Sequence, residues 1–238
     1  MKVVKFGGSS LASASQLEKV LNIVKSDKER RFVVVSAPGK RNAEDTKVTD
    51  ALIKYYRDYV AGNDISTSQN WIIDRYAAMV SELGLKPTVL EKISKSIRAL
   101  ATLPIEENDF LYDTFLAAGE NNNAKLIAAY FNQNGIDARY VHPREAGIIV
   151  TSELLASFHP VMTRLKDWLT ATKSLSFLVS LGLPRKIKSV PSHEEDQTLR
   201  VLSLLQVSKL TSTKTLQMLM VSLPPTLVSF TNPTLSQS

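Results

Sequence analysis

The sequence has no cysteine and only three histidines in 238 residues. The lack of cysteine excludes disulfides, thiolate zinc sites and cysteine nucleophiles, and three scattered histidines argue against a histidine metal cluster. No apolar run approaches the roughly 18 residues of a membrane-spanning helix, and the opening residues lack the apolar core of a signal peptide. We therefore expect a cytoplasmic protein with no membrane partner and no metal held by its own side chains. Any metal should be Mg²⁺ that arrives with a nucleotide.

The net charge of +6 is unevenly distributed along the chain. Residues 1–153 contain 20 basic and 19 acidic residues, whereas residues 154–238 contain 9 and 4. No interleaving of arginine with aromatic residues accompanies the basic part, so we expect no nucleic-acid partner.

Residues 1–153 alternate strand-like and helix-like segments, as in an α/β fold whose parallel strands are joined by helices. Strands are predicted over residues 2–6, 31–37 and 138–142. A helix should bury Leu17, Val20, Leu21 and Val24 on one face. Residues 48–103 are mostly helical, with turns at 62–64 and 84–87. Two more helices, near 109–118 and 123–132, are expected on either side of Gly119 and Glu120.

The residues after the first predicted strand are typical of a phosphate-binding turn. They read Lys5-Phe6-Gly7-Gly8-Ser9-Ser10. Two residues without a Cβ let backbone N–H groups approach an anion, and the N-terminus of the following helix adds a favourable dipole. Lys5 can place a cation on the same oxyanion. A plain glycine turn is the alternative, and Ser9 either caps the helix or hydrogen-bonds a phosphate or substrate.

The string KFGGSS resembles the opening signature of aspartate kinases, within the amino acid kinase family, and the resemblance covers residues 1–153. It implies the amino-terminal lobe of a three-layer α/β/α fold. It also implies transfer of the γ-phosphoryl group of MgATP to the side-chain carboxylate of L-aspartate, the first step toward lysine, threonine and methionine. Lys5 would be catalytic, Lys5, Gly7, Gly8 and Ser9 would bind ATP, and Ser9 would also contact substrate. A homo-oligomer is expected for full-length members.

Three further positions are candidates for the same site. Ser36 follows the second predicted strand, at the edge where open α/β sheets bind ligands, and would face the nucleotide. Thr49 resembles the family's threonine contact to the substrate, or else is only a helix-start residue. Glu120, in Ala117-Ala118-Gly119-Glu120, resembles the AxGE segment whose glutamate pairs with the amino group of aspartate.

Glu120 also has a purely structural interpretation, in which it complements the dipole of a helix that begins near Asn122. We interpret the neighbouring Asn121, Asn122 and Asn123 as capping and turn residues.

The composition changes near Glu153. The remaining 85 residues contain 18 Leu but one Gly and two Ala. In a shifted reading frame, each codon would consist of the third base of one present codon and the first two bases of the next. In that frame, codons that could encode residues 192–200 can also encode SRGGSDITG, and those for residues 214–226 can encode NFTDVDGIFAAHP. Both strings resemble aspartate kinase segments in the expected order. We therefore hypothesise a shift of reading frame between about residues 153 and 158. Residues 154–238 would then be an aberrant, non-native or disordered tail without a domain of its own.

A chain without the in-frame SRGGSD and TDVDG segments is expected to be inactive. Two alternatives remain open at this stage. One is another amino acid kinase, acting on acetylglutamate, glutamate or a nucleoside monophosphate such as UMP. The other is a non-catalytic binding protein whose basic tail holds an acidic partner.

Overall fold

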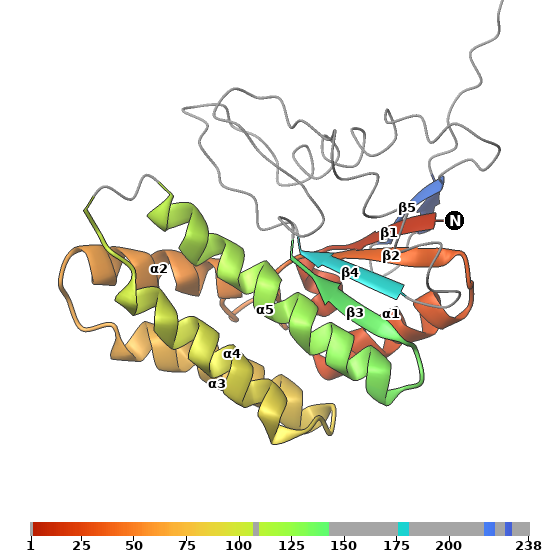
Figure 1. Ribbon diagram of the computed structural model, residues 1–238, viewed down its shortest axis with the longest axis horizontal. Coiled ribbons are helices and arrows are strands. Elements are labelled where there is room, and N and C mark those ends of the chain that lie inside the picture. Colours follow the sequence, from red (N-terminus) through yellow and green to blue (C-terminus); the bar gives the residue numbers. More distant parts are fainter. Residues whose placement is uncertain (1, 107–109, 143–175, 181–216, 222–226, 230–238) are drawn as a thin grey trace, which may run out of the picture.

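The computed structural model describes residues 2–106, 110–142, 176–180, 217–221 and 227–229 (Figure 1). The described strands form one six-stranded sheet in the order β3-β4-β2-β1-β5-β6. Strand β6 is antiparallel to β5, and every other neighbouring pair is parallel. The strands are β1 (Lys2–Phe6), β2 (Arg30–Val35), β3 (Ala138–Val141), β4 (Ser176–Ser180), β5 (Gln217–Val221) and β6 (Leu227–Ser229).

The helical elements of the described residues lie between β1 and β3 in the chain. They are the 3₁₀ turn η1 (Gly8–Leu11), α1 (Ala14–Lys25), α2 (Val48–Val60), α3 (Ser66–Glu82), α4 (Pro87–Ala99), η2 (Leu100–Thr102) and α5 (Leu111–Gln133). These bounds confirm the predicted helical region with its two turns, at each of which a glycine adopts a positive φ: 69° at Gly62 and 62° at Gly84. Among the described residues, no helix combines the length and the apolar character needed to span a membrane.

The first two strands are β-branched and aromatic segments that bury one face under the helices. Val4 pairs with Val33 and Phe6 pairs with Val35 in the parallel register. All four side chains are buried and belong to the main hydrophobic core. The sheet interior predicted from the apolar runs is therefore confirmed, with β2 starting one residue earlier and ending two residues earlier than expected.

Helices α1 and α5 pack on the same face of the sheet. The connections from β1 to β2 and from β2 to β3 both move the chain in the same direction across the sheet. Because such connections are right-handed, the helices in both of them cover the same face of the sheet. Helix α1 buries Leu17, Val20, Leu21 and Val24, as its periodicity predicts. Helix α5 lies along β2, β3 and β4. Helices α2, α3 and α4 extend past the carboxyl ends of the strands, on the left of Figure 1.

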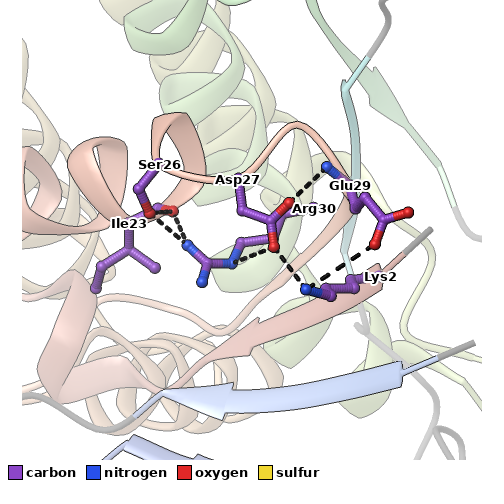
Figure 2. Close-up of polar contacts among 6 residues, drawn as sticks. All are labelled: Lys2, Ile23, Ser26, Asp27, Glu29 and Arg30. Carbon is purple, nitrogen blue, oxygen red and sulfur yellow. Dashed lines mark hydrogen bonds and ion pairs between the residues drawn. The ribbon is translucent and has the colours of Figure 1, made fainter.

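A cluster of polar side chains lies at the opposite end of the strands, where β1 and β2 begin (Figure 2). Lys2 Nζ lies 2.7 Å from an Asp27 carboxylate oxygen, and Arg30 reaches the same carboxylate at 3.8 Å. The Arg30 guanidinium also donates to Ser26 Oγ at 2.7 Å and to the carbonyl oxygen of Ile23, at the end of α1. These contacts tie the end of α1 and the starts of both strands together.

Residues 154–238 contribute β4, β5 and β6 to the sheet. Strand β4 lies between β2 and β3, and β5 lies beside β1. The described segments of this range therefore belong to the same sheet as the strands of residues 1–153. The remainder of the range, with the proposed SRGGSD position at residues 192–200, lies outside the described residues. The interpretation of residues 154–238 as an aberrant tail stays a prediction.

Candidate active site

Two loops meet at the carboxyl edge of the central strands. Strand β1 ends at Phe6 and strand β2 ends at Val35, and because the strands are parallel both loops leave the sheet on the same side. The Ser36 N–H donates to the Phe6 carbonyl at 3.3 Å. The Gly39 N–H then donates to the Gly8 carbonyl at 2.9 Å, which joins the two loops directly.

Glycine is required at both ends of this hydrogen bond. A Cβ on Gly8 would lie 2.9 Å from the Ala37 carbonyl oxygen, and a Cβ on Gly39 would lie 2.6 Å from the Gly8 carbonyl carbon. Both distances are shorter than van der Waals contact allows, and the neighbouring atoms are backbone atoms that cannot rotate away. The sequence predicted Gly8 as a site residue, but the partner glycine in the second loop was not identified.

Lys5 and Gly7 are neighbours at this edge. The position that a Cβ would take on Gly7 is 3.8 Å from Lys5 Nζ, so the ammonium group turns toward the glycine turn at the end of its own strand. Gly7 has an extended backbone, with φ −77° and ψ 167°. The turn thus combines an adjacent cation with a glycine whose Cβ position has only the Lys5 ammonium group within 4 Å.

The helix that follows the glycines begins later than the sequence predicts, which was near Leu11. Gly8–Leu11 forms the 3₁₀ turn η1, and α1 begins only at Ala14. Its cap is Ser13, whose Oγ accepts a hydrogen bond from the Gln16 N–H at 3.4 Å. Ser9 therefore does not cap α1, and the dipole of α1 does not point into the glycine turn from the adjacent residue. Ser9 lies within η1 and is exposed.

The second loop is anchored from α5. Asn123 is fully buried and its Nδ2 donates to the Ser36 carbonyl oxygen at 2.7 Å. Ser36, predicted to face the nucleotide, is partly exposed at the edge that also holds Gly7 and Gly8. Asn123 was predicted as a capping or turn residue, and that prediction is wrong because the helix continues through it.

Helix α5 is continuous from Leu111 to Gln133, so the break expected at Gly119 and Glu120 is wrong. The glycine is explained by packing. A Cβ on Gly119 would lie 2.9 Å from Ala37 Cβ and 3.0 Å from Leu52 Cδ1. The glycine therefore allows α5 to approach the second loop and α2. The dipole interpretation of Glu120 also fails, because no helix begins near Asn122.

Thr49 and Glu120 flank one contact between α2 and α5. A Cβ on Gly119 would lie 3.6 Å from Val48 Cγ1, so each candidate is one residue away from this contact. Both side chains are partly exposed. Thr49 is the second residue of α2, and the helix start has Lys47 as its cap. The structure thus brings the two candidates for substrate binding to the edge that carries the glycine turn.

A buried tyrosine supports the helix at this point. Tyr76 Oη donates to the Gly119 carbonyl oxygen at 2.8 Å. The phenol is fully buried, and this burial, together with the nearby Glu120 carboxylate, raises the pKa of Tyr76 far above its usual range. The hydroxyl therefore stays protonated and acts as a hydrogen-bond donor.

A buried arginine beside the two loops was not predicted from the sequence. Arg75, in α3, lies 3.4 Å from Asp45, and Arg41 holds the same carboxylate at 2.8 and 2.9 Å. Hydrogen bonding to Arg41 is the main cause that lowers the pKa of Asp45 far below its usual range, and Arg75 adds to it. Burial lowers the pKa of Arg75, and the Asp45 charge opposes that shift. The available signal was an arginine on the apolar face of a helix, where Ile72 and Tyr76 are also buried.

No group of three or more His, Asp or Glu side chains within the described ranges could hold a metal ion. The candidate site consists of two glycine-containing loops, a lysine and several polar side chains at the carboxyl ends of the strands. A glycine turn with an adjacent lysine is suited to bind the oxyanions of a phosphate group.

The sequence matches known proteins along most of its length. The model of the amino acid kinase family matches residues 1–189. Aspartokinase 3 of Bacillus subtilis is 50% identical over 153 residues, which cover 64% of this chain and 34% of the relative. The chloroplastic aspartokinase 2 of Arabidopsis thaliana is 29% identical over 181 residues, covering 70% of this chain and 32% of the relative. The chain thus spans about a third of the length of these curated relatives.

Solved structures agree with the sequence matches. The aspartate kinase of Clostridium acetobutylicum has a TM-score of 0.59 and 28% identity, over 76% of this chain and 38% of the other. The aspartokinase III of E. coli, in complex with aspartate and ADP, has a TM-score of 0.55 and 19% identity, over 76% of this chain and 40% of the other. The second similarity concerns the fold alone. With its family match over residues 1–189 and its resemblance to aspartate kinases, this chain belongs to the amino acid kinase family.

Proposed function

We propose that this chain carries the amino-terminal part of an aspartate kinase active site, which phosphorylates the side-chain carboxylate of L-aspartate with ATP. The product is 4-phospho-L-aspartate, the entry to lysine, threonine and methionine synthesis. The observation that supports this most strongly is the contact between Gly8 and Gly39, with Lys5 Nζ beside Gly7. The aspartokinase names of the relatives support the choice of substrate within the family.

The proposed reaction transfers the γ-phosphoryl group in line. A carboxylate oxygen of aspartate bonds to the γ-phosphorus while the bond from that phosphorus to the β,γ-bridging oxygen breaks, and ADP leaves. Negative charge spreads over the transferred oxygens, so catalysis rests on positioning and on compensating charge. Lys5 would supply a positive charge, and the backbone N–H groups of Gly7 and Gly8 would supply hydrogen-bond donors. Mg²⁺ that arrives with the nucleotide would add charge neutralisation.

The acceptor would bind on the side of the site formed by α2 and α5. Glu120 would pair with the ammonium group of aspartate, because a carboxylate complements that charge. Thr49 and Ser9 would donate hydrogen bonds to the substrate, and Ser36 would face the nucleotide. The position of Thr49 and Glu120 next to the contact between Val48 and Gly119 supports this assignment.

We further propose that the chain as written is inactive. We propose a cytoplasmic location for it, and a homo-oligomeric state for the full-length enzymes of the family. The match to the Bacillus subtilis relative extends over 153 residues, which is the length assigned here to the in-frame part. The family model reaches residue 189, so the frame hypothesis has to be tested separately. In the written frame, the SRGGSD and TDVDG strings are absent.

The experiment compares two proteins in an assay of aspartyl hydroxamate formed from ATP, aspartate and hydroxylamine. One is the chain as written, and the other is encoded after a single frame correction between residues 153 and 158. The first should give no product above background, and the corrected protein should be active with aspartate. Turnover by the uncorrected chain would refute the proposed inactivity. Release of ADP by the corrected protein with acetylglutamate, glutamate or UMP, but not with aspartate, would refute aspartate as the substrate.

A further inference from the structure

The guanidinium of Arg75 lies between the two loops of the site. Its Nη2 donates to the Ala12 carbonyl at 2.5 Å and to the Gly39 carbonyl at 3.0 Å. Its side chain is 2% exposed, although it carries a full positive charge. Burial of a charge is unfavourable unless the charge is paired and hydrogen-bonded, so the side chain must depend on acceptors from these loops.

The hydrogen bonds continue from Arg75 into the glycine contact. Gly39 receives the arginine at its carbonyl oxygen and donates its own N–H to the Gly8 carbonyl. Ala12, which accepts the other bond of Nη2, follows η1 and so belongs to the loop that contains Gly8. One side chain of α3 therefore contacts both loops and fixes the Gly39 residue that touches Gly8.

The loop before α2 is closed by the same group of charges. The Asp45 carboxylate accepts from the Arg41 backbone N–H at 2.9 Å as well as from the Arg41 guanidinium. Its other close cation is Arg75 at 3.4 Å, and the Asp45 side chain is only 6% exposed. The conformation of residues 41–45 is thus coupled to the position of the Arg75 guanidinium.

We propose that Arg75 is a positioning residue for the anion-binding loops, acting through Gly39 on Gly8 and through Asp45 on the loop before α2. The effect on phosphate binding rests on the proposed function. The effect of Arg75 on the conformation of the loops does not. Helix α3 buries Ile72, Tyr76 and Met79 on the same side, so its packing does not depend on the arginine. Loss of the guanidinium should therefore change the loops and leave the helices and the sheet in place.

The first test measures amide hydrogen exchange by NMR in the complete 238-residue chain and in Arg75→Met. The Gly39 amide should exchange at least about tenfold faster in the variant, as expected for loss of a charge-assisted hydrogen bond. The Val34 amide, inside β2, should not change. Arg57→Met removes an exposed arginine of α2 and is the matched control. Unchanged Gly39 exchange, or an equal increase at Gly39 and Val34, would overturn the inference.

Asp45→Asn serves as a second variant in case Arg75→Met does not fold. It keeps Arg75 but removes the charge that pairs with it, and exchange at Arg41 and Gly39 should again increase while Val34 stays unchanged. If both amides keep their wild-type rates in this variant, the inference is also overturned.

The second test titrates MgATP into the same proteins. Arg75→Met should weaken binding by at least about tenfold, and Arg57→Met should bind like the wild type. Equal affinity of Arg75→Met and the wild type would overturn the positioning role. If the wild type binds no MgATP, the proposed function fails, and the exchange experiment alone decides the role of Arg75.

Discussion

Gly39 touches Gly8 through its backbone: its N–H donates to the Gly8 carbonyl at 2.9 Å, and a Cβ on Gly39 would be 2.6 Å from the Gly8 carbonyl carbon. Gly39→Ala should therefore separate the two loops. We expect a loss of about 1–3 kcal/mol in the free energy of unfolding, the usual cost of inserting a methylene into a packed site, measured by urea denaturation.

The matched control is Gly7→Ala in the same turn. A Cβ on Gly7 would meet only Lys5 Nζ within 4 Å, at 3.8 Å, and its φ is negative. We expect a change within about 0.5 kcal/mol, as for other substitutions without a steric conflict. Equal losses in the two variants would contradict the account of the loop contact.

Two neighbouring asparagines of α5 should respond in opposite ways to leucine. Asn123 Nδ2 donates to the Ser36 carbonyl, so Asn123→Leu should cost about 1–3 kcal/mol by leaving that carbonyl without its donor. Asn122 is fully buried, and in the described part of the structure neither of its amide atoms has a partner. Asn122→Leu should therefore be neutral or stabilising by about 1 kcal/mol. Thermal unfolding of both variants checks this, and a reversed order would refute the assigned hydrogen bonds.

Stability at alkaline pH should depend on Tyr76. Burial raises the folded-state pKa of its hydroxyl above the unfolded value of about 10. The unfolded chain then loses this proton first, so the contribution of Tyr76 is fully present below about pH 10 and decreases as the pH rises, by up to about 1.4 kcal/mol per pH unit. Tyr76→Phe should make the alkaline slope of the unfolding free energy shallower. The partly exposed Tyr112 provides the control, Tyr112→Phe, and equal slopes in all three proteins would contradict the burial argument.

The sequence was sufficient to predict elements that depend on local pattern. The apolar runs of β1 and β2, the buried face of α1 and the two turns with glycines at positive φ follow from periodicity and backbone preference. The glycine turn with Lys5 was also predictable, because its chemistry lies within six consecutive residues.

Features that depend on distant contacts were not predictable. The sequence suggested a helix break at Gly119, since glycine usually disfavours helices. The structure shows that Gly119 makes room for Ala37 and Leu52, which are 82 and 67 positions earlier. Arg75 was missed for the same reason, because its acceptors at Ala12 and Gly39 come from other loops. Asn123, 87 positions from Ser36, was mistaken for a turn residue.

The central claim is that Lys5 and the glycine turn bind the phosphates of a nucleotide. The direct measurement is a calorimetric titration of MgATP into the wild-type chain and into Lys5→Met. The account predicts saturable binding by the wild type and at least about a tenfold loss of affinity in the variant, as expected for removal of one charge-assisted contact. Equal affinity of the two proteins, or no binding by the wild type, would contradict it.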